Sequence, residues 1–113
     1  GLKFTIDTSV PSSVKKDDKG LFVAVEGDRR VKDVFVEKNG EWQPIDPEAT
    51  YTIARHTYLL QDMGDGYTMF ADNQYILDKV MLDNQVIITY ICDFLGGNVG
   101  EEYAAPQGRI TII

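Results

Sequence analysis

The sequence contains few of the residues that bind metals or form disulfides. Among its 113 residues there is one histidine, His56, and one cysteine, Cys92. A lone cysteine cannot form an internal disulfide, and a site for two metal ions needs several converging His, Asp and Asn ligands. No HxxxH or HxH spacing supplies such a set. We therefore expect no metal site, no cofactor and no catalytic residue within this sequence.

Several other classes of protein are disfavoured by what is missing. No apolar run approaches the ~20 residues that a membrane-spanning helix requires. There is no Gly-x-Ser-x-Gly elbow, no Walker loop and no Rossmann fingerprint. The net charge is −7, whereas sequence-independent binding of nucleic acid depends on a basic surface. We therefore expect neither a membrane span nor a nucleic-acid partner, and an independent small hydrolase would rest only on the presence of Ser, His and Asp.

The first half of the chain has the pattern of strands joined by turns. Residues 2–7 alternate between apolar and polar side chains, which predicts a half-buried strand. The polar residues 8–20 are expected to form a loop, and the β-prone runs at 21–25 and 31–36 a hairpin. Asn39-Gly40 is a strong signal for a further hairpin turn. An apolar content of 43% is typical of a globular domain.

The second half predicts one more strand, a helix and a closing strand. Residues 51–54 and 109–113 are β-prone. Between them Asp83 is a good N-cap, Gly96-Gly97 is a helix terminator, and Cys92 is expected to be buried beside the apolar face. That face repeats with helical spacing at Ile87, Tyr90, Ile91, Phe94 and Leu95. We predict an α+β fold, a mixed β-sheet with hairpins and one main late amphipathic helix, within a single domain or part-domain over residues 1–113.

The clearest candidate for a binding site is the loop that contains Gly64, Asp65, Gly66 and Tyr67. Glycines on either side of an acidic residue allow a tight turn and a close approach of the backbone to a ligand. The carboxylate between them can accept two hydrogen bonds, for example from a sugar diol. The aromatic faces of Tyr58 and Tyr67 are candidates for stacking on a base. A solvated turn without a ligand is the competing interpretation of the same pattern.

The order of the segments VKDVFV, PIDPEATYTIA and GDGYTMF resembles the C-terminal domain of the 5′-nucleotidases. That family includes UDP-sugar hydrolases and 2′,3′-cyclic-nucleotide phosphodiesterases. The resemblance extends from LKFTID near the start to GRITI near the end. It implies a domain that binds the nucleoside while an N-terminal metallophosphoesterase domain of the same chain, with two divalent metal ions, hydrolyses the phosphoester. It also implies an extracellular, cell-surface or periplasmic location.

Within the family an aspartate in a Gly-Gly-Asp-Gly-(Phe/Tyr) loop binds the ribose hydroxyls, and two aromatic rings sandwich the base. Asp65 matches that aspartate, and Gly66 and Tyr67 match the residues after it. Tyr58 is the preferred stacking ring, although counting back from Asp65 points to Leu59. The resemblance covers roughly the second half of the family's domain, so the other ring and the phosphate-binding arginines lie outside this sequence.

One departure from the family pattern concerns the loop itself. Met63-Gly64 stands where the family has Gly-Gly, and methionine has less access to positive φ than glycine. Two functions therefore remain open. The chain is the nucleoside-recognition part of a 5′-nucleotidase-like hydrolase, or it is a non-catalytic interaction or structural domain that kept the fold and lost the ligand.

Overall fold

The computed structural model describes residues 1–113, which form two compact units. The sheet unit consists of Gly1–Thr52 and Pro106–Ile113, and the helical unit consists of Ile53–Ala105. All β-strands lie in the first and all helices in the second. The expectation of one domain over residues 1–113 stays a prediction.

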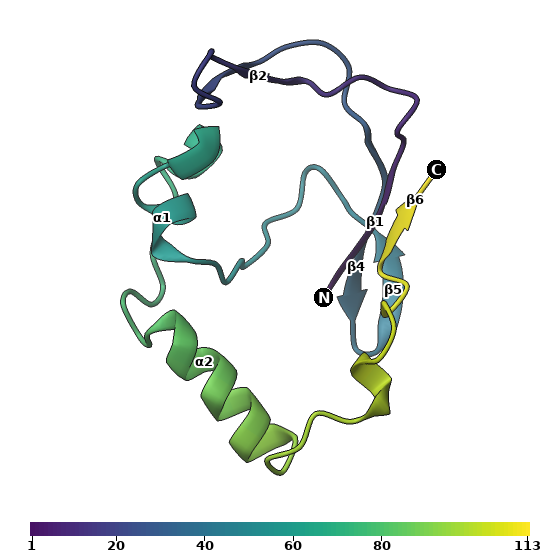
Figure 1. Ribbon diagram of the computed structural model, residues 1–113, viewed down its shortest axis with the longest axis vertical. Coiled ribbons are helices and arrows are strands. Elements are labelled where there is room, and N and C mark those ends of the chain that lie inside the picture. The colour runs from purple at the N-terminus through teal and green to yellow at the C-terminus, as the bar shows by residue number, and fades with distance from the viewer. The chain divides into compact units, whose positions relative to one another are not determined.

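The main sheet has four strands in the order β5-β4-β1-β6 (Figure 1). The strands are β1 (Leu2–Ile6), β4 (Val31–Lys38), β5 (Glu41–Pro44) and β6 (Ile110–Ile112). β4 pairs antiparallel with both β1 and β5, whereas β6 lies parallel to β1. The sheet is therefore mixed, and together with the helices it confirms the predicted α+β class.

The alternation in the sequence sets which side chains share a face of this sheet. Leu2 is opposite Val36, Phe4 is opposite Ile110, and Ile6 is opposite Ile112. Because side chains alternate along a strand, these apolar residues lie on one face. The strands predicted from residues 2–7 and 109–113 are thus confirmed.

The Asn39-Gly40 turn is also confirmed. It joins β4 to β5, with φ of 54° at Asn39 and 81° at Gly40. Positive φ at both central residues is the geometry of a type I′ turn, which matches the natural twist of the strands.

On the sheet, Lys3 Nζ lies 5.7 Å from the ring centre of Phe35 and 5.9 Å from that of Trp42.

The predicted pairing of residues 21–25 with residues 31–36 was wrong. The run 21–25 forms β3 (Phe22–Val25), but its partner is β2 (Val14–Lys16), which lies in the expected loop, and not β4. The turn between them is organised by Asp17, whose Oδ1 accepts hydrogen bonds from the backbone N–H groups of Lys19 and Leu21 at 2.9 and 2.8 Å. Asp side chains favour turns by this kind of local bond.

The predicted strand at residues 51–54 does not form. These residues have a β-prone composition, but no neighbouring strand is present for them to pair with. The helical unit follows, with its elements drawn from teal to yellow-green in Figure 1. Its helices are α1 (Thr57–Leu60), η1 (Gly64–Gly66), η2 (Thr68–Phe70), α2 (Asp83–Thr89), η3 (Tyr90–Phe94) and η4 (Glu101–Tyr103).

The late helix exists, but it differs from the prediction in three ways. Leu82 is the N-cap, and Asp83 is the first helical residue. The α-helix changes at Tyr90 into a π-helical turn, η3, which ends at Phe94 and is followed by Gly96 and Gly97 with positive φ. Cys92 lies in that turn and is exposed, so the expectation that it is buried beside the apolar face was wrong.

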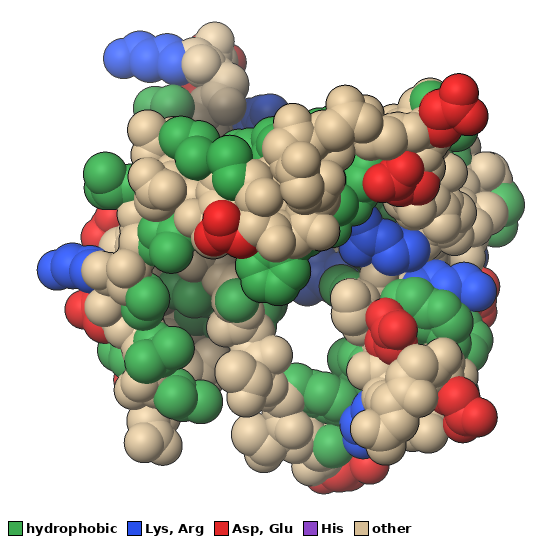
Figure 2. Space-filling model, turned by 90° about the horizontal axis from the view of Figure 1, so that it is seen from below, with side chains coloured by type: hydrophobic (Ala, Val, Ile, Leu, Met, Phe, Trp, Pro, Cys, Tyr) green, Lys and Arg blue, Asp and Glu red, His purple; other side chains and the backbone are tan.

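The apolar face of this helix is largely open. Ile87 and Phe94 are 61% and 74% exposed, although Ile91 and Leu95 are half-buried. No residue of the chain is fully buried, and hydrophobic side chains occupy much of the face drawn in Figure 2. None of the helices has the length and apolar content needed to cross a membrane.

Candidate functional site

The candidate site is built on α1 and the loop that follows it, all within the helical unit. His56 caps α1, because its Nδ1 accepts a hydrogen bond from the backbone N–H of Tyr58 at 3.3 Å. Nε2 of the same ring lies 3.5 Å from Oδ2 of Asp83. These two contacts hold the turn that carries Tyr58.

The loop after α1 contains two non-glycine residues in the left-handed region. Met63 has φ 53° and ψ 30°, and Asp65 has φ 52° and ψ 23°. Gly66 continues with φ 81°. Aspartate tolerates this region better than most residues, whereas a methionine there costs roughly 1–2 kcal/mol. Met63 therefore does adopt the positive φ for which glycine is better suited.

Gly64 is required for a different reason, the close approach of Tyr58. A Cβ built on Gly64 would lie 2.2, 2.3 and 2.5 Å from Cζ, Cε1 and Cε2 of Tyr58. Such similar distances place it over the face of the ring, because a position in the ring plane would be much nearer to Cζ. One face of Tyr58 thus lies directly on the backbone at Gly64, where any larger residue would displace it.

The same tyrosine reaches the carboxylate of the loop. Tyr58 Oη donates a long hydrogen bond of 3.4 Å to Oδ1 of Asp65. Asp65 is exposed, and Tyr58 keeps 47% of its surface exposed. Leu59, the other candidate for the stacking position, is half-buried and has no π face. The structure thus brings together Tyr58, Gly64 and Asp65.

Tyr67, the last of the predicted residues, is held by two neighbours. Its ring is stacked on Phe70, with centroids 6.1 Å apart and planes 7° apart. The guanidinium carbon of Arg55 lies 5.5 Å from the centre of the Tyr67 ring. Sequence reasoning missed Arg55, since no motif signals a contact between residues twelve positions apart in a loop.

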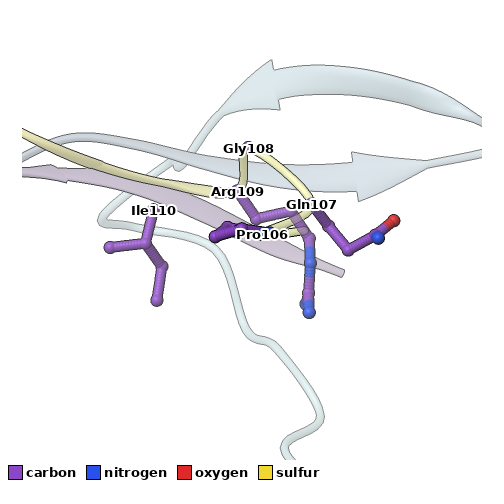
Figure 3. A pocket seen from close by; sticks show the side chains of 5 residues that line it. All are labelled: Pro106, Gln107, Gly108, Arg109 and Ile110. Atoms are coloured by element: carbon purple, nitrogen blue, oxygen red, sulfur yellow. The ribbon is translucent and has the colours of Figure 1, made fainter. Parts of the chain in front are cut away.

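Outside the loop, we find neither a pocket large enough for a ligand nor a group of residues that could hold a metal ion. The sheet unit has a pocket of about 120 Å³ lined by Pro106, Gln107, Gly108, Arg109 and Ile110. The side chains of Arg109 and Ile110 lie on the same side of the ribbon in Figure 3, but the pocket is smaller than the ~300 Å³ at which ligand pockets begin. No three His, Cys, Asp or Glu side chains come together in a group suited to holding a metal ion.

Comparison with known proteins gives the family of the chain. Residues 1–72 match the model of the 5′-nucleotidase C-terminal domain, a stretch that includes α1 and the whole Gly-Asp-Gly loop. The chain is 37% identical to an apyrase of Tabanus yao over 73 residues, which are 65% of this chain and 12% of that protein. It is 30% identical to Protein 5NUC of Lutzomyia longipalpis over 89 residues, 75% of this chain and 14% of that protein. No solved structure matches.

The mixed sheet and the short helices define an α+β chain, which carries a Gly-Asp-Gly loop after α1. The match over residues 1–72 is specific to one family, and the chain belongs to the 5′-nucleotidase family, within its C-terminal domain. It spans only 12% and 14% of the two relatives.

Proposed function

We propose that this chain forms part of the nucleoside-binding site of a 5′-nucleotidase-family phosphohydrolase. Tyr58 stacks on the base, and Asp65 accepts hydrogen bonds from the ribose hydroxyls. Gly64 and Gly66 shape the loop, and Tyr67 supports it. The observation that carries the proposal is the Tyr58 ring lying on Gly64 with its hydroxyl 3.4 Å from the Asp65 carboxylate.

This arrangement suits a nucleoside on physical grounds. Since one face of Tyr58 is covered by backbone and the residue remains half exposed, the opposite face is available to a base. Base–aromatic stacking contributes roughly 1–3 kcal/mol. Asp65 is exposed, and its Oδ1 is engaged by only a long bond, so both oxygens are accessible to a diol. Stacking and diol binding together recognise a ribonucleoside without selecting strongly among bases.

The chemistry of hydrolysis is assigned to a separate domain. Because this chain does not bring metal ligands together, we propose that two divalent ions in an N-terminal metallophosphoesterase domain of the same protein act on the phosphoester. The chain described here then contributes binding and no catalytic residue. An extracellular, cell-surface or periplasmic location accompanies this assignment.

The proposal is tested by titrating the full-length protein with adenosine and with 2′,3′-dideoxyadenosine in a calorimeter. Adenosine should bind at least tenfold more tightly, because a charge-assisted hydrogen bond contributes about 1.5–3 kcal/mol. Asp65→Asn should remove most of that difference and leave the dideoxy ligand unaffected. Asparagine also tolerates positive φ, so the backbone at φ 52° is preserved.

Asp62→Asn provides the matched control, since Asp62 is an exposed aspartate of the same loop and the change in charge is equal. It should leave both affinities unchanged. If adenosine does not bind, or if the Asp62 and Asp65 variants behave alike, the nucleoside-site proposal is wrong and the non-catalytic interaction domain is favoured instead.

A further inference from the structure

His56 is the only histidine of the chain, and protonation of its ring affects its two contacts in opposite ways. Its Nδ1 accepts a hydrogen bond of 3.3 Å from the backbone N–H of Tyr58, which is the N-cap contact of α1. Its Nε2 lies 3.5 Å from Oδ2 of Asp83, the first residue of α2. A protonated imidazole has two N–H donors and no acceptor. Protonation therefore removes the cap and strengthens the attraction to Asp83.

We propose that His56 is a positioning residue, which makes ligand binding at Tyr58 depend on pH. The inference rests on the proposed nucleoside site, because His56 acts on that site through the turn that carries Tyr58. When the ring is neutral, the cap holds the start of α1 while the Tyr58 ring lies over Gly64. When the ring is charged, the backbone N–H of Tyr58 loses its acceptor, the turn loosens and nucleoside binding weakens.

The cap is important because little else holds the start of α1. The helix has only four residues, Thr57–Leu60, and no acidic side chain lies in its first turn. The first N–H groups of a helix have no acceptor within the helix, so a side chain that precedes it has to supply one. A helix of this length is marginal without such contacts. The loss of one cap is therefore expected to release Tyr58 from its position.

Asp83 is oriented to attract the ring once it is charged. Its Oδ1 accepts a hydrogen bond of 2.7 Å from the backbone N–H of Asn84, and its Oδ2 is the atom near His56. The two side chains of this pair are 56% and 75% exposed. An exposed ion pair contributes little by itself, so the lost cap is the main consequence of protonation.

The other charged groups near this turn have different contacts. Arg55 directly precedes His56, but its guanidinium lies over an aromatic ring of the following loop. Asp65 of η1 accepts the hydrogen bond of Tyr58 Oη, and Asp62 forms no ion pair. Histidine is the side chain that ordinarily changes its charge between pH 5 and 8. A pH dependence of the turn in this interval is therefore assigned to the imidazole.

The test measures adenosine binding to the full-length protein by calorimetry at about pH 7.5 and about pH 5.5. Wild type should bind roughly threefold or more weakly at the lower pH, as expected for the loss of an N-cap. His56→Asn should bind about equally at both pH values, because asparagine is a good N-cap that does not titrate. His56→Ala should bind weakly at both.

Asp83→Asn is the matched control, since it removes the charge beside the ring and leaves the cap. Its affinity should still fall with pH, but at a lower pH than in wild type, because the carboxylate no longer favours the charged ring. NMR of protein with isotope-labelled tyrosine gives a second measurement, with the Tyr58 amide signal identified by its loss in Tyr58→Phe. That signal should shift over the same pH interval in wild type and stay in place in His56→Asn.

Equal wild-type affinities at the two pH values would overturn the inference and leave His56 as a structural cap. A pH profile that His56→Asn shares with wild type would overturn it as well, because the dependence would then come from another group. If adenosine binds at neither pH, the nucleoside site fails and this inference fails with it. The Tyr58 amide signal would still show in that case whether His56 acts on the turn, which separates the two results.

Discussion

At the scale of single residues, the site depends on contacts that only small side chains permit. Gly64 does not need a left-handed backbone, but it lies under the face of Tyr58 at a distance that no Cβ tolerates. Met63 and Asp65 on either side take the positive φ values instead. The loop thus separates two tasks, close approach at the glycine and chain reversal at its neighbours.

This separation predicts the effect of Gly64→Ala. The added methyl group would lie 2.2 Å from Cζ of Tyr58, so the ring must move off the loop and away from Asp65. Overpacking of this kind costs typically 1–3 kcal/mol. We expect adenosine affinity to fall roughly tenfold or more in titration calorimetry, with circular dichroism of the helices nearly unchanged.

A double-mutant cycle separates the clash from a general loss of loop structure. In a Tyr58→Ala background the ring is absent, so Gly64→Ala should have little further effect on affinity or on the free energy of unfolding. Gly100→Ala is not used as the control for Gly64→Ala, because a Cβ at Gly100 would meet the flexible end of the Glu102 side chain. Additive losses from Tyr58→Ala and Gly64→Ala would contradict the stacked arrangement.

At the scale of elements, Asp7 ties the end of β1 to β4. Its Oδ2 lies 2.5 Å from Lys32 Nζ, and its Oδ1 accepts bonds from Oγ and N of Ser9 at 2.6 and 3.0 Å. The hydrogen bonds from Lys32 and then Ser9 lower the pKa of Asp7 from 3.8 to about 2. Thr8 adds a hydrogen bond of 2.7 Å to the carbonyl of Ile113 beyond β6.

A lowered pKa in the folded state means that Asp7 stabilises the sheet unit when it is ionised. That contribution is complete above the unfolded pKa of 3.8 and is lost as the pH falls toward about 2. We expect the free energy of unfolding, followed by the fluorescence of Trp42 in β5, to decrease over this interval. Asp7→Asn should flatten this part of the profile, and the exposed Asp28→Asn should not. An unchanged profile in Asp7→Asn would show that the contacts with Lys32 and Ser9 contribute nothing.

The elements also show what could be predicted from the sequence. β1, β6 and the Asn39-Gly40 turn followed from patterns that are local, namely alternation and turn chemistry. The partner of β3 could not be predicted in this way, because it depends on how the Asp17 side chain closes a turn within a polar segment. The strand predicted at residues 51–54 does not form, because a β-prone composition does not by itself supply a neighbouring strand to pair with.

The candidate site divides along the same line. Asp65, its glycines and Tyr67 were recognisable from the motif, and Tyr58 from the need for a ring near it. Two contacts could not be predicted from the motif, namely the position of Tyr58 over Gly64 and the contact of Arg55 with Tyr67. Both depend on the path of the loop between the two residues. The exposure of Cys92 was not predicted either, because the repeat of apolar residues does not show whether anything covers that face, and Ile87 and Phe94 on it are exposed as well.

At the scale of the whole molecule, the proposed function assigns nucleoside binding to this chain and hydrolysis to another domain. The chain spans 12% and 14% of its two relatives, and its own residues do not bring metal ligands together. If hydrolysis occurs on another domain, recognition and chemistry should respond separately to mutation. This separation is measurable with two phosphomonoesters, one that carries a nucleoside and one that does not.

We therefore predict that Asp65→Asn in the full-length protein raises KM for AMP roughly tenfold to hundredfold, as expected for the loss of a charge-assisted bond of about 1.5–3 kcal/mol. The kcat should be nearly unchanged, because the bond is made equally in the ground state and the transition state. Hydrolysis of p-nitrophenyl phosphate, which has no ribose, should be spared. Tyr58→Ala should give the same pattern through lost stacking, whereas Leu59→Ala at the half-buried neighbour should mainly lower stability. Equal losses on both substrates in the Asp65 variant would instead identify the loop as structural, because a binding residue for ribose cannot affect a substrate that lacks it.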